Sequence, residues 1–474
     1  MLSLGFAAGL PLLLTGGTFS AYLRDLGVEL AAIGFLSWVG MAYSFKVLWA
    51  PIVDRVRLPF LSAWLGRRRA WMLAAQVVIA AALLAIALLD PREQLWWIAV
   101  FAVLTAFAAA TQDIAIDAYR IEAVTKEKQA AMAATYVTGY RVALLAAGAG
   151  ALHIAALDFS GLFAGLAAGP FSFLAGVTGS DPELSGWSAA YAVMAALMAI
   201  GIITTLIVRE PEVRSADASS QRIEAKLAGL PTAAPASDDT PAQPSEVLAG
   251  ASLWLRLRAF VAGAIVAPFV EFFARFGRVA LLVLAVIGVF RIADIFMGVM
   301  ANPFYLDLGF TKQEIANIAA MFGLAMTLTG AALGGLLVAR FGLWRLMVAA
   351  ALLAPLTNLA FSALALTGPD RGMLMLAIAA DNLSGGLAIA VFIAWLSSLT
   401  HSAYTATQYA LFSSLMTLPG QFLAGFTGVY AEFVGWFWFF VSSAAIGVPT
   451  ILLVLLLGRY AHPDRLPQPG RVDP

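Results

Sequence analysis

VALLVLAVIGVFRIADIFMG, residues 279–298, is apolar along its whole length except at Arg291 and Asp294. At 1.5 Å per residue, a helix of about 20 residues crosses the hydrocarbon core of a bilayer. Similar windows recur along most of the 474 residues, which are 61% hydrophobic and 12% charged. Soluble proteins average about 25% charged residues. The sequence therefore predicts an all-α, polytopic membrane protein.

Twelve spans are predicted from the apolar windows. They begin near Leu4, Ala31, Ala70, Leu95, Ala130, Trp187, Val279, Gln313, Leu343, Gly372, Ser402 and Trp436. Of the 28 Lys and Arg residues, 21 fall in the tail and the loops after even-numbered spans, and only 4 in the odd loops. Because cytoplasmic loops retain positive charge, both termini are predicted to be cytoplasmic.

The linker between two six-helix halves shows in the composition. EAKLAGLPTAAPASDDTPAQPSE, residues 224–246, is too polar and proline-rich to bury a core. We expect a first half at 1–210, a flexible cytoplasmic linker at 211–251, an interfacial amphipathic helix at 252–278, a second half at 279–460 and a cytoplasmic tail at 461–474. The apolar stretch 159–179 is expected to be re-entrant or to lie on the surface, since a thirteenth crossing would break the charge alternation.

Charged residues inside the predicted spans indicate where a polar cavity lies. An ion at the bilayer centre costs about 2.5–3.5 kcal/mol on insertion scales, so such residues are candidates for function. They are Lys46 in span two, Asp113 and Asp117 in span four, Arg141 in span five, Arg291 and Asp294 in span seven, and Asp381 in span ten. Spans three, six, nine and twelve carry none. This period of three predicts that spans four, seven and ten line a central cavity, flanked by two and five.

Asp113 and Asp117 are four residues apart, so one helix face carries both carboxylates. Two carboxylates this close resist ionising together in a low dielectric, which favours a proton carrier. The alternative is a permanent ion-pair network completed by Arg141 on the next helix.

Other charges divide between structural and functional interpretations. Arg291 and Asp294 can pair within their own helix, and Lys46 can extend its ammonium to cytoplasmic water. Asp381 has no charged neighbour along its helix. The predicted proton-coupling residues are Asp294 and Asp381, followed by Asp113 and Asp117.

A cytoplasmic gate is predicted around Asp54, at the C-terminal end of span two. The helix dipole disfavours an anion there, so a cation or a helix N-terminus must compensate it. The compensating groups are expected to be Arg55, Arg67, Arg68, Arg69 and the start of span eleven. This latch would hold while the cavity is open to the outside and break when the cavity opens inward.

Several function classes are disfavoured. The chain has no cysteine, which excludes thiolate chemistry. His153, His401 and His462 stand in no metal-ligand spacing, and no phosphate-cradling GxxxxGK[ST] occurs. We therefore expect no metal, cofactor or nucleic acid, and a transporter rather than a membrane enzyme or a receptor.

Motifs spread along the chain resemble those of one transporter family. They include GFAAGLPLLLTGGT (5–18), YSFKVLWAPIVDR (43–55), GRRRAW (66–71), ATQDIAIDAYRIE (110–122), GYRVALLAAG (139–148), RIADIF (291–296), DNLSGG (381–386) and ATQYALFSSL (406–415). DR followed by GRRR resembles the major facilitator signature, and the whole set resembles the AmpG-type muropeptide permeases.

That resemblance implies proton-driven import of anhydro-muropeptides across the bacterial inner membrane, for cell-wall recycling and β-lactamase induction. A monomer in contact with lipid is the family default, and alternating access is the expected mechanism. Acetyl-coenzyme A or a nucleotide conjugate is the alternative substrate. The expected substrate-binding residues are Tyr43, Lys46, Gln112, Tyr140, Arg141, Arg291, Asn382 and Gln408.

Overall fold

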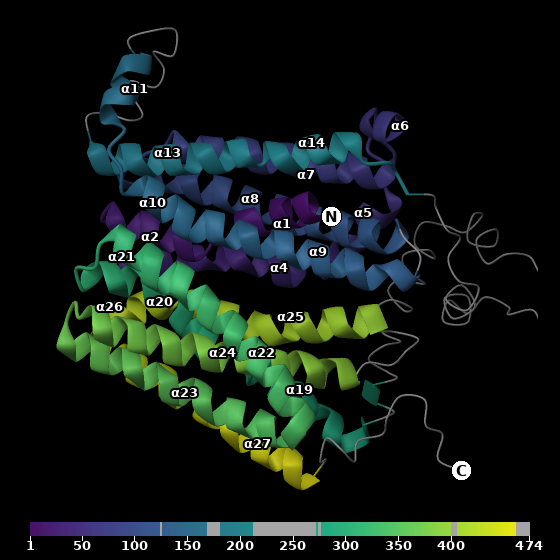
Figure 1. Cartoon of the computed structure of the whole chain (residues 1–474), viewed down its shortest axis with the longest axis vertical. Coiled ribbons are helices and arrows are strands. Elements are labelled where there is room, and N and C mark those ends of the chain that lie inside the picture. The colour runs from purple at the N-terminus through teal and green to yellow at the C-terminus, as the bar shows by residue number, and fades with distance from the viewer. Residues whose placement is uncertain (124–125, 168–180, 212–271, 274–275, 400–404, 461–474) are drawn as a thin grey trace, which may run out of the picture.

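The computed structural model describes residues 1–123, 126–167, 181–211, 272–273, 276–399 and 405–460. Regular structure in this part of the chain is entirely helical. Most of the predicted linker and interfacial helix, and all of the predicted tail, lie outside the described residues. So do residues 168–179 of the predicted re-entrant stretch, while its described part forms α11, which projects beyond the bundle in Figure 1.

Helices of the first half run from the N-terminus to Ile207. They are α1 (Leu2–Leu14), α2 (Gly17–Asp25), α3 (Leu30–Leu36), α4 (Met41–Phe45), α5 (Ala50–Arg55), α6 (Leu61–Leu65), α7 (Arg67–Ala87), α8 (Pro91–Glu122), α9 (Lys126–Leu145), α10 (Ala151–Ala155), α11 (Ser160–Ala167), α13 (Pro182–Leu197) and α14 (Ala199–Ile207). Short 3₁₀ turns flank α4, and the π-helical segment Ala146–Gly150 joins α9 to α10.

Helices of the second half begin after the 3₁₀ turn Gly277–Val279. They are α19 (Ala280–Val289), α20 (Ile292–Asp307), α21 (Lys312–Glu314), α22 (Gly323–Phe341), α23 (Leu343–Thr367), α24 (Arg371–Leu399), α25 (Thr405–Ala424), α26 (Thr427–Ile446) and α27 (Val448–Tyr460). The π-helical segment Ile315–Phe322 joins α21 to α22.

Ten helical stretches in the described part of the chain are long and apolar enough to cross a membrane. They match ten of the twelve predicted spans. At the predicted second span, Leu30–Phe45 forms a shorter apolar helix that continues through broken turns to Arg55. At the predicted eleventh, α25 covers Thr405–Ala424. The chain is thus a multi-pass membrane protein, and the number of twelve spans stays a prediction.

Gly435 divides α26 into two segments. Its backbone has φ 75° and ψ 164°, a left-handed conformation that glycine adopts without steric cost. Trp436, the predicted start of the twelfth span, follows directly. The helical path is therefore broken at Gly435, just where the last span was predicted to begin.

Two helix bundles lie side by side in Figure 1, the first half above and the second half below. Met1, α5 and α6 lie at the right, which we call the proximal end. The ends of α2 and α20, together with α21, lie at the left, which we call the distal end. Across the halves, α2 packs on α20, α3 on α26, and α4 on α25.

Glycines let several helices approach each other backbone to backbone. A Cβ on Gly139 of α9 would lie 1.9 Å from the Leu2 carbonyl oxygen of α1. A Cβ on Gly386 of α24 would lie 2.1 Å from the Thr327 carbonyl oxygen of α22. Lipid tails are as apolar as the helices, so close van der Waals contact of this kind is a main attraction between spans.

Gly385 and Gly386 form a matched pair for testing that contact. A Cβ on Gly385 would meet nothing within 4 Å, and both residues are helical. We expect Gly386→Ala to lower the thermal unfolding temperature in detergent, because overpacking costs about 1–3 kcal/mol. Gly385→Ala should be neutral or slightly stabilising. Equal unfolding temperatures for the two variants would contradict the packing described here.

Candidate substrate cavity

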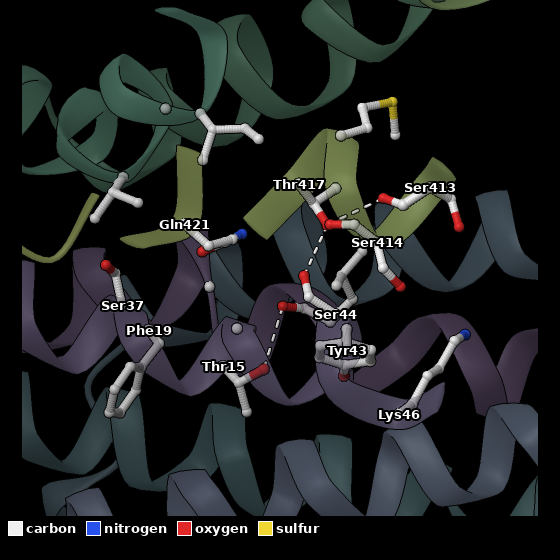
Figure 2. Close-up of a pocket in the computed structure, with 18 of the residues that line it drawn as sticks. Thr15, Phe19, Ser37, Tyr43, Ser44, Lys46, Ser413, Ser414, Thr417 and Gln421 are labelled. Carbon is white, nitrogen blue, oxygen red and sulfur yellow. Dashed lines mark hydrogen bonds between the residues drawn. The ribbon is translucent and has the colours of Figure 1, made fainter. Parts of the chain in front are cut away.

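A cavity of about 660 Å³ lies between the halves and is rich in hydroxyl groups (Figure 2). We call it the hydroxyl chamber. Its polar lining residues are Thr15, Ser20, Ser37, Tyr43, Ser44, Lys46, Asp117, Ser413, Ser414, Thr417 and Gln421. The Ser44 and Thr417 hydroxyls lie 2.7 Å apart and join the first half to the second. This chamber therefore offers many groups that both donate and accept hydrogen bonds.

A second cavity, of about 420 Å³, gathers intramembrane charges of both halves. We call it the ionic chamber. Arg141 comes from the first half, whereas Arg291, Asp294 and Asp381 come from the second. Two cations and two anions thus face one space, and ligands with both charges fit it.

The two chambers meet at Gly17 and Gly298, which line both. Broken helices supply these walls: α1 ends before Thr15 and Gly16, and α19 ends before Arg291. Discontinuous spans near the midplane are typical of transporter binding sites. The described lining comes from predicted spans one, two, four, five, seven, eight, ten and eleven, in agreement with the charge period. Spans one, eight and eleven were missed because they carry no intramembrane charge.

Asp113 and Asp117 are each paired with a cation, but not with Arg141. Lys46 Nζ lies 3.7 Å from Asp113 Oδ2, and Arg120 Nη2 lies 3.3 Å from Asp117 Oδ1. The expectation that Arg141 completes this network is wrong for the described contacts, because Arg141 lines the ionic chamber instead. Lys46 is held at a carboxylate in the protein interior, with its side chain 37% exposed.

Arg291 Nε and Asp294 Oδ2 lie 3.4 Å apart, as the three-residue spacing predicted. Asp381 lacks a charged neighbour along its own helix, but the fold brings it to the same chamber as this pair. Asn382 also lines the chamber, yet its amide is already engaged. It accepts from Thr327 Oγ1 at 2.8 Å and donates to the Ile378 carbonyl at 3.0 Å.

Other predicted substrate-binding residues lie in different places. Tyr43 lines the hydroxyl chamber. Gln112 is fully buried, and neither of its amide atoms has a hydrogen-bond partner in the described structure. Tyr140 packs beside Tyr136, with ring centroids 6.2 Å apart. The side chain of Gln408 lies outside the described residues.

Part of the predicted cytoplasmic gate has a role within the first half. The backbone N–H groups of Arg68 and Arg69 donate to the Glu210 carboxylate at 2.7 and 3.1 Å. The Arg69 guanidinium donates to the Thr205 and Leu206 carbonyls at the end of α14. The side chains of Asp54 and Arg55 lie outside the described residues, so the gate stays a prediction, as does the participation of Arg67.

Two ion pairs join the halves at the distal end, and we call this group the distal latch. Arg24 donates to both Asp307 oxygens at 2.6 and 2.9 Å, and Lys312 donates to Asp25 at 2.8 Å. Each aspartate also accepts from an indole of its own half. Trp187 Nε1 lies 2.6 Å from Asp25, and Trp436 Nε1 lies 3.1 Å from Asp307.

The distal latch repeats between the halves. Asp25 ends α2 in the first predicted span, and Asp307 ends α20 in the seventh. Their indole partners stand near the starts of the sixth and twelfth. Sequence reasoning missed the latch because these residues lie at span ends, where charged and aromatic side chains are common.

Tight packing of α3 on α26 closes the same end. A Cβ on Gly428 would lie 1.7 Å from the Leu30 carbonyl oxygen, and one on Gly34 would lie 2.8 Å from the Gly425 oxygen. Trp38 Nε1 also donates across the halves to the Phe422 carbonyl at 2.9 Å. Together with the distal latch, these contacts hold the halves together at the distal end.

Comparison with known proteins gives consistent relatives. A family profile described as acetyl-coenzyme A transporter 1 matches residues 1–97. The chain is 32% identical to the anhydromuropeptide permease of Escherichia coli strain K12, over 96% of this chain and 78% of the relative. It is 29% identical to the putative transporter AmpG 4 of Rickettsia conorii, over 96% and 94%.

Solved transporter structures share the fold. The TM-score is 0.66 against a bacterial homologue of the human lysosomal transporter Spinster, inward-facing and occupied, at 15% identity over 98% of this chain and 96% of the other. It is 0.60 against the nucleoside transporter NupG, at 15% identity over 97% of each chain. The predicted major facilitator fold is confirmed.

Breaking the distal latch should separate the halves at that end. Because part-buried ion pairs contribute about 1 kcal/mol each, or about 2 kcal/mol for both, we expect Asp25→Asn with Asp307→Asn to raise the distal-open population roughly thirtyfold. The chain has no native cysteine, so single cysteines placed on α2 and α20 report the distance by spin labelling. Glu183→Gln, which touches neither ion pair, is the control. An unchanged distance distribution in the double variant would show that the latch does not hold this end closed.

Proposed function

The chain belongs to the AmpG family of anhydromuropeptide permeases, and we propose that it imports anhydro-muropeptides into the bacterial cytoplasm, driven by protons. It is a membrane transporter rather than an enzyme. The proposed substrates carry the disaccharide of N-acetylglucosamine and anhydro-N-acetylmuramic acid, with or without a peptide. Import would supply cell-wall recycling and, through it, β-lactamase induction.

The observation that carries this proposal is the pair of adjoining chambers between the halves. Hydroxyl and amide groups suit the sugars, and a chamber with both charge signs suits a peptide with amino and carboxyl groups. Volumes of about 660 and 420 Å³ fall in the usual range for ligand pockets.

Alternating access is the proposed mechanism. With cytoplasmic termini, the proximal end faces the cytoplasm and the distal end faces the periplasm. The distal latch and the glycine contacts would then hold the periplasmic side closed, which supports an inward-facing state. Import requires the halves to rock until the proximal side closes and the distal side opens.

Asp381 and Asp294 are the proposed proton carriers. Both line the ionic chamber, where proton binding and ligand binding share one electrostatic environment. Asp294 already has Arg291 as a partner, whereas Asp381 has no ion pair in the described structure. Asp113 and Asp117 are weaker candidates, since Lys46 and Arg120 neutralise them.

Acetyl-coenzyme A is the second candidate substrate, because the profile matched at residues 1–97 is described as acetyl-coenzyme A transporter 1. Competition distinguishes the two candidates. An excess of unlabelled acetyl-coenzyme A should leave muropeptide uptake unchanged if the first proposal is right.

Uptake of radiolabelled anhydro-muropeptide into vesicles tests the proposed function directly. We expect accumulation under an imposed proton gradient, abolished by an uncoupler. Absence of uptake by correctly folded protein would overturn the substrate, and uncoupler-resistant accumulation would overturn the coupling.

Neutralising the proton carrier should separate accumulation from exchange. We expect Asp381→Asn to reduce gradient-driven accumulation more than tenfold while substrate exchange continues. The neutral asparagine resembles a protonated aspartate, so the substrate-loaded protein can still change conformation, but no proton moves with the substrate. Asp370→Asn, whose carboxylate contacts only the backbone N–H of Met373 among the described contacts, is the control. Full accumulation in both Asp381→Asn and Asp294→Asn would exclude these carriers.

A further inference from the structure

The two chambers differ in chemistry although they lie next to each other and share Gly17 and Gly298 as lining residues. Within the described lining, the hydroxyl chamber carries Lys46 and Asp117 as its only charges, and Lys46 is paired with Asp113. The ionic chamber carries four charges and a small number of hydroxyls. A ligand that is neutral and rich in hydroxyl groups at one end and zwitterionic at the other therefore suits both chambers.

Groups of the hydroxyl chamber match a carbohydrate. Figure 2 shows Ser44, Thr417 and Gln421 lining this chamber from the two halves. A hydroxyl group can both donate and accept a hydrogen bond, so it can act as donor or as acceptor toward the hydroxyl and acetamide groups of a sugar. Tyr43 adds an aromatic ring beside them, on which an apolar sugar face can rest.

Groups of the ionic chamber match a peptide. Arg141 and Asp381 line it and have no ion pair in the described structure, whereas Arg291 and Asp294 pair with each other. A guanidinium binds a carboxylate through two parallel hydrogen bonds, and a carboxylate binds an ammonium. One cation and one anion are thus available for the carboxylate and amine of a peptide.

Both residues shared by the chambers, which we call the junction, are glycines. Asn302 Nδ2 donates to the Gly17 carbonyl at 2.6 Å, which fixes α2 against α20. A Cβ on Gly298, the other junction residue, would meet nothing within 4 Å, so Gly298 borders open space. A larger side chain there would fill the junction without displacing any packed atom at its Cβ.

We propose that the hydroxyl chamber binds the disaccharide and the ionic chamber binds the peptide, with the bond between them passing the junction at Gly17 and Gly298. This assignment rests on the proposed function and adds an orientation to it. The disaccharide and the peptide are then recognised by different residues.

Binding of two ligands to purified protein, without a proton gradient, tests the assignment. One ligand is the disaccharide with its lactyl carboxyl capped as an amide, which carries no charge, and the other is the disaccharide tripeptide. We expect Arg141→Ala to weaken the tripeptide form at least tenfold more than the neutral disaccharide. Ser44→Ala combined with Thr417→Val should weaken both ligands by similar factors.

The junction is tested by Gly298→Leu. We expect the tripeptide form to bind at least tenfold more weakly, with a smaller loss for the disaccharide. Gly335→Leu is the control, because a Cβ on Gly335 also meets nothing within 4 Å and this residue lines neither chamber. A retained unfolding temperature shows that the variants fold.

Distinct outcomes overturn distinct claims. Equal losses for both ligands in Arg141→Ala, or unchanged tripeptide binding in Gly298→Leu, would refute the division into chambers while leaving the proposed substrate intact. Failure of the folded wild-type protein to bind either ligand would refute the proposed function itself, and this assignment with it.

Discussion

A charge inside a bilayer must find an opposite charge or a polar space, and the arrangement of this interior follows from that requirement. Lys46 meets Asp113, Arg120 meets Asp117, and Arg291 meets Asp294. Arg141 and Asp381 instead line a cavity. The three pairs each form within one half, and the two remaining charges, Arg141 of the first half and Asp381 of the second, face the same space between the halves.

The helical, two-bundle architecture was predictable from sequence because hydrocarbon permits few alternatives: each spanning segment must satisfy its own backbone. Hydropathy located ten stretches that the structure contains, and the backbone at Gly435 breaks the last of these stretches next to Trp436, the predicted start of the twelfth span. The period of the intramembrane charges also indicated which helices face the cavity, since an unpaired charge is tolerated only there.

What the sequence could not give depends on contacts between distant residues. Ser44 and Thr417 are ordinary hydroxyls until the fold sets them 2.7 Å apart. Asp381 seemed isolated because its neighbours come from another helix. Asn382 looked like a ligand group, yet Thr327 and its own helix occupy its amide. Hydroxyl and amide groups carry no periodic signal, so only the fold shows which of them line a cavity and which hold helices together.

The distal latch has a consequence for the speed of a transport cycle. Each of its aspartates has a partner that departs with the other half and an indole N–H that belongs to its own half. In the proposed opening of the halves, water would reach the carboxylates while the indoles would still hold them in position. The aspartates thus keep a hydrogen-bond donor and their orientation, so that Lys312 and Arg24 can bind them again when the halves close. A carrier works fastest when its two end states differ little in free energy, and a contact that keeps its indole hydrogen bonds on opening keeps that difference small.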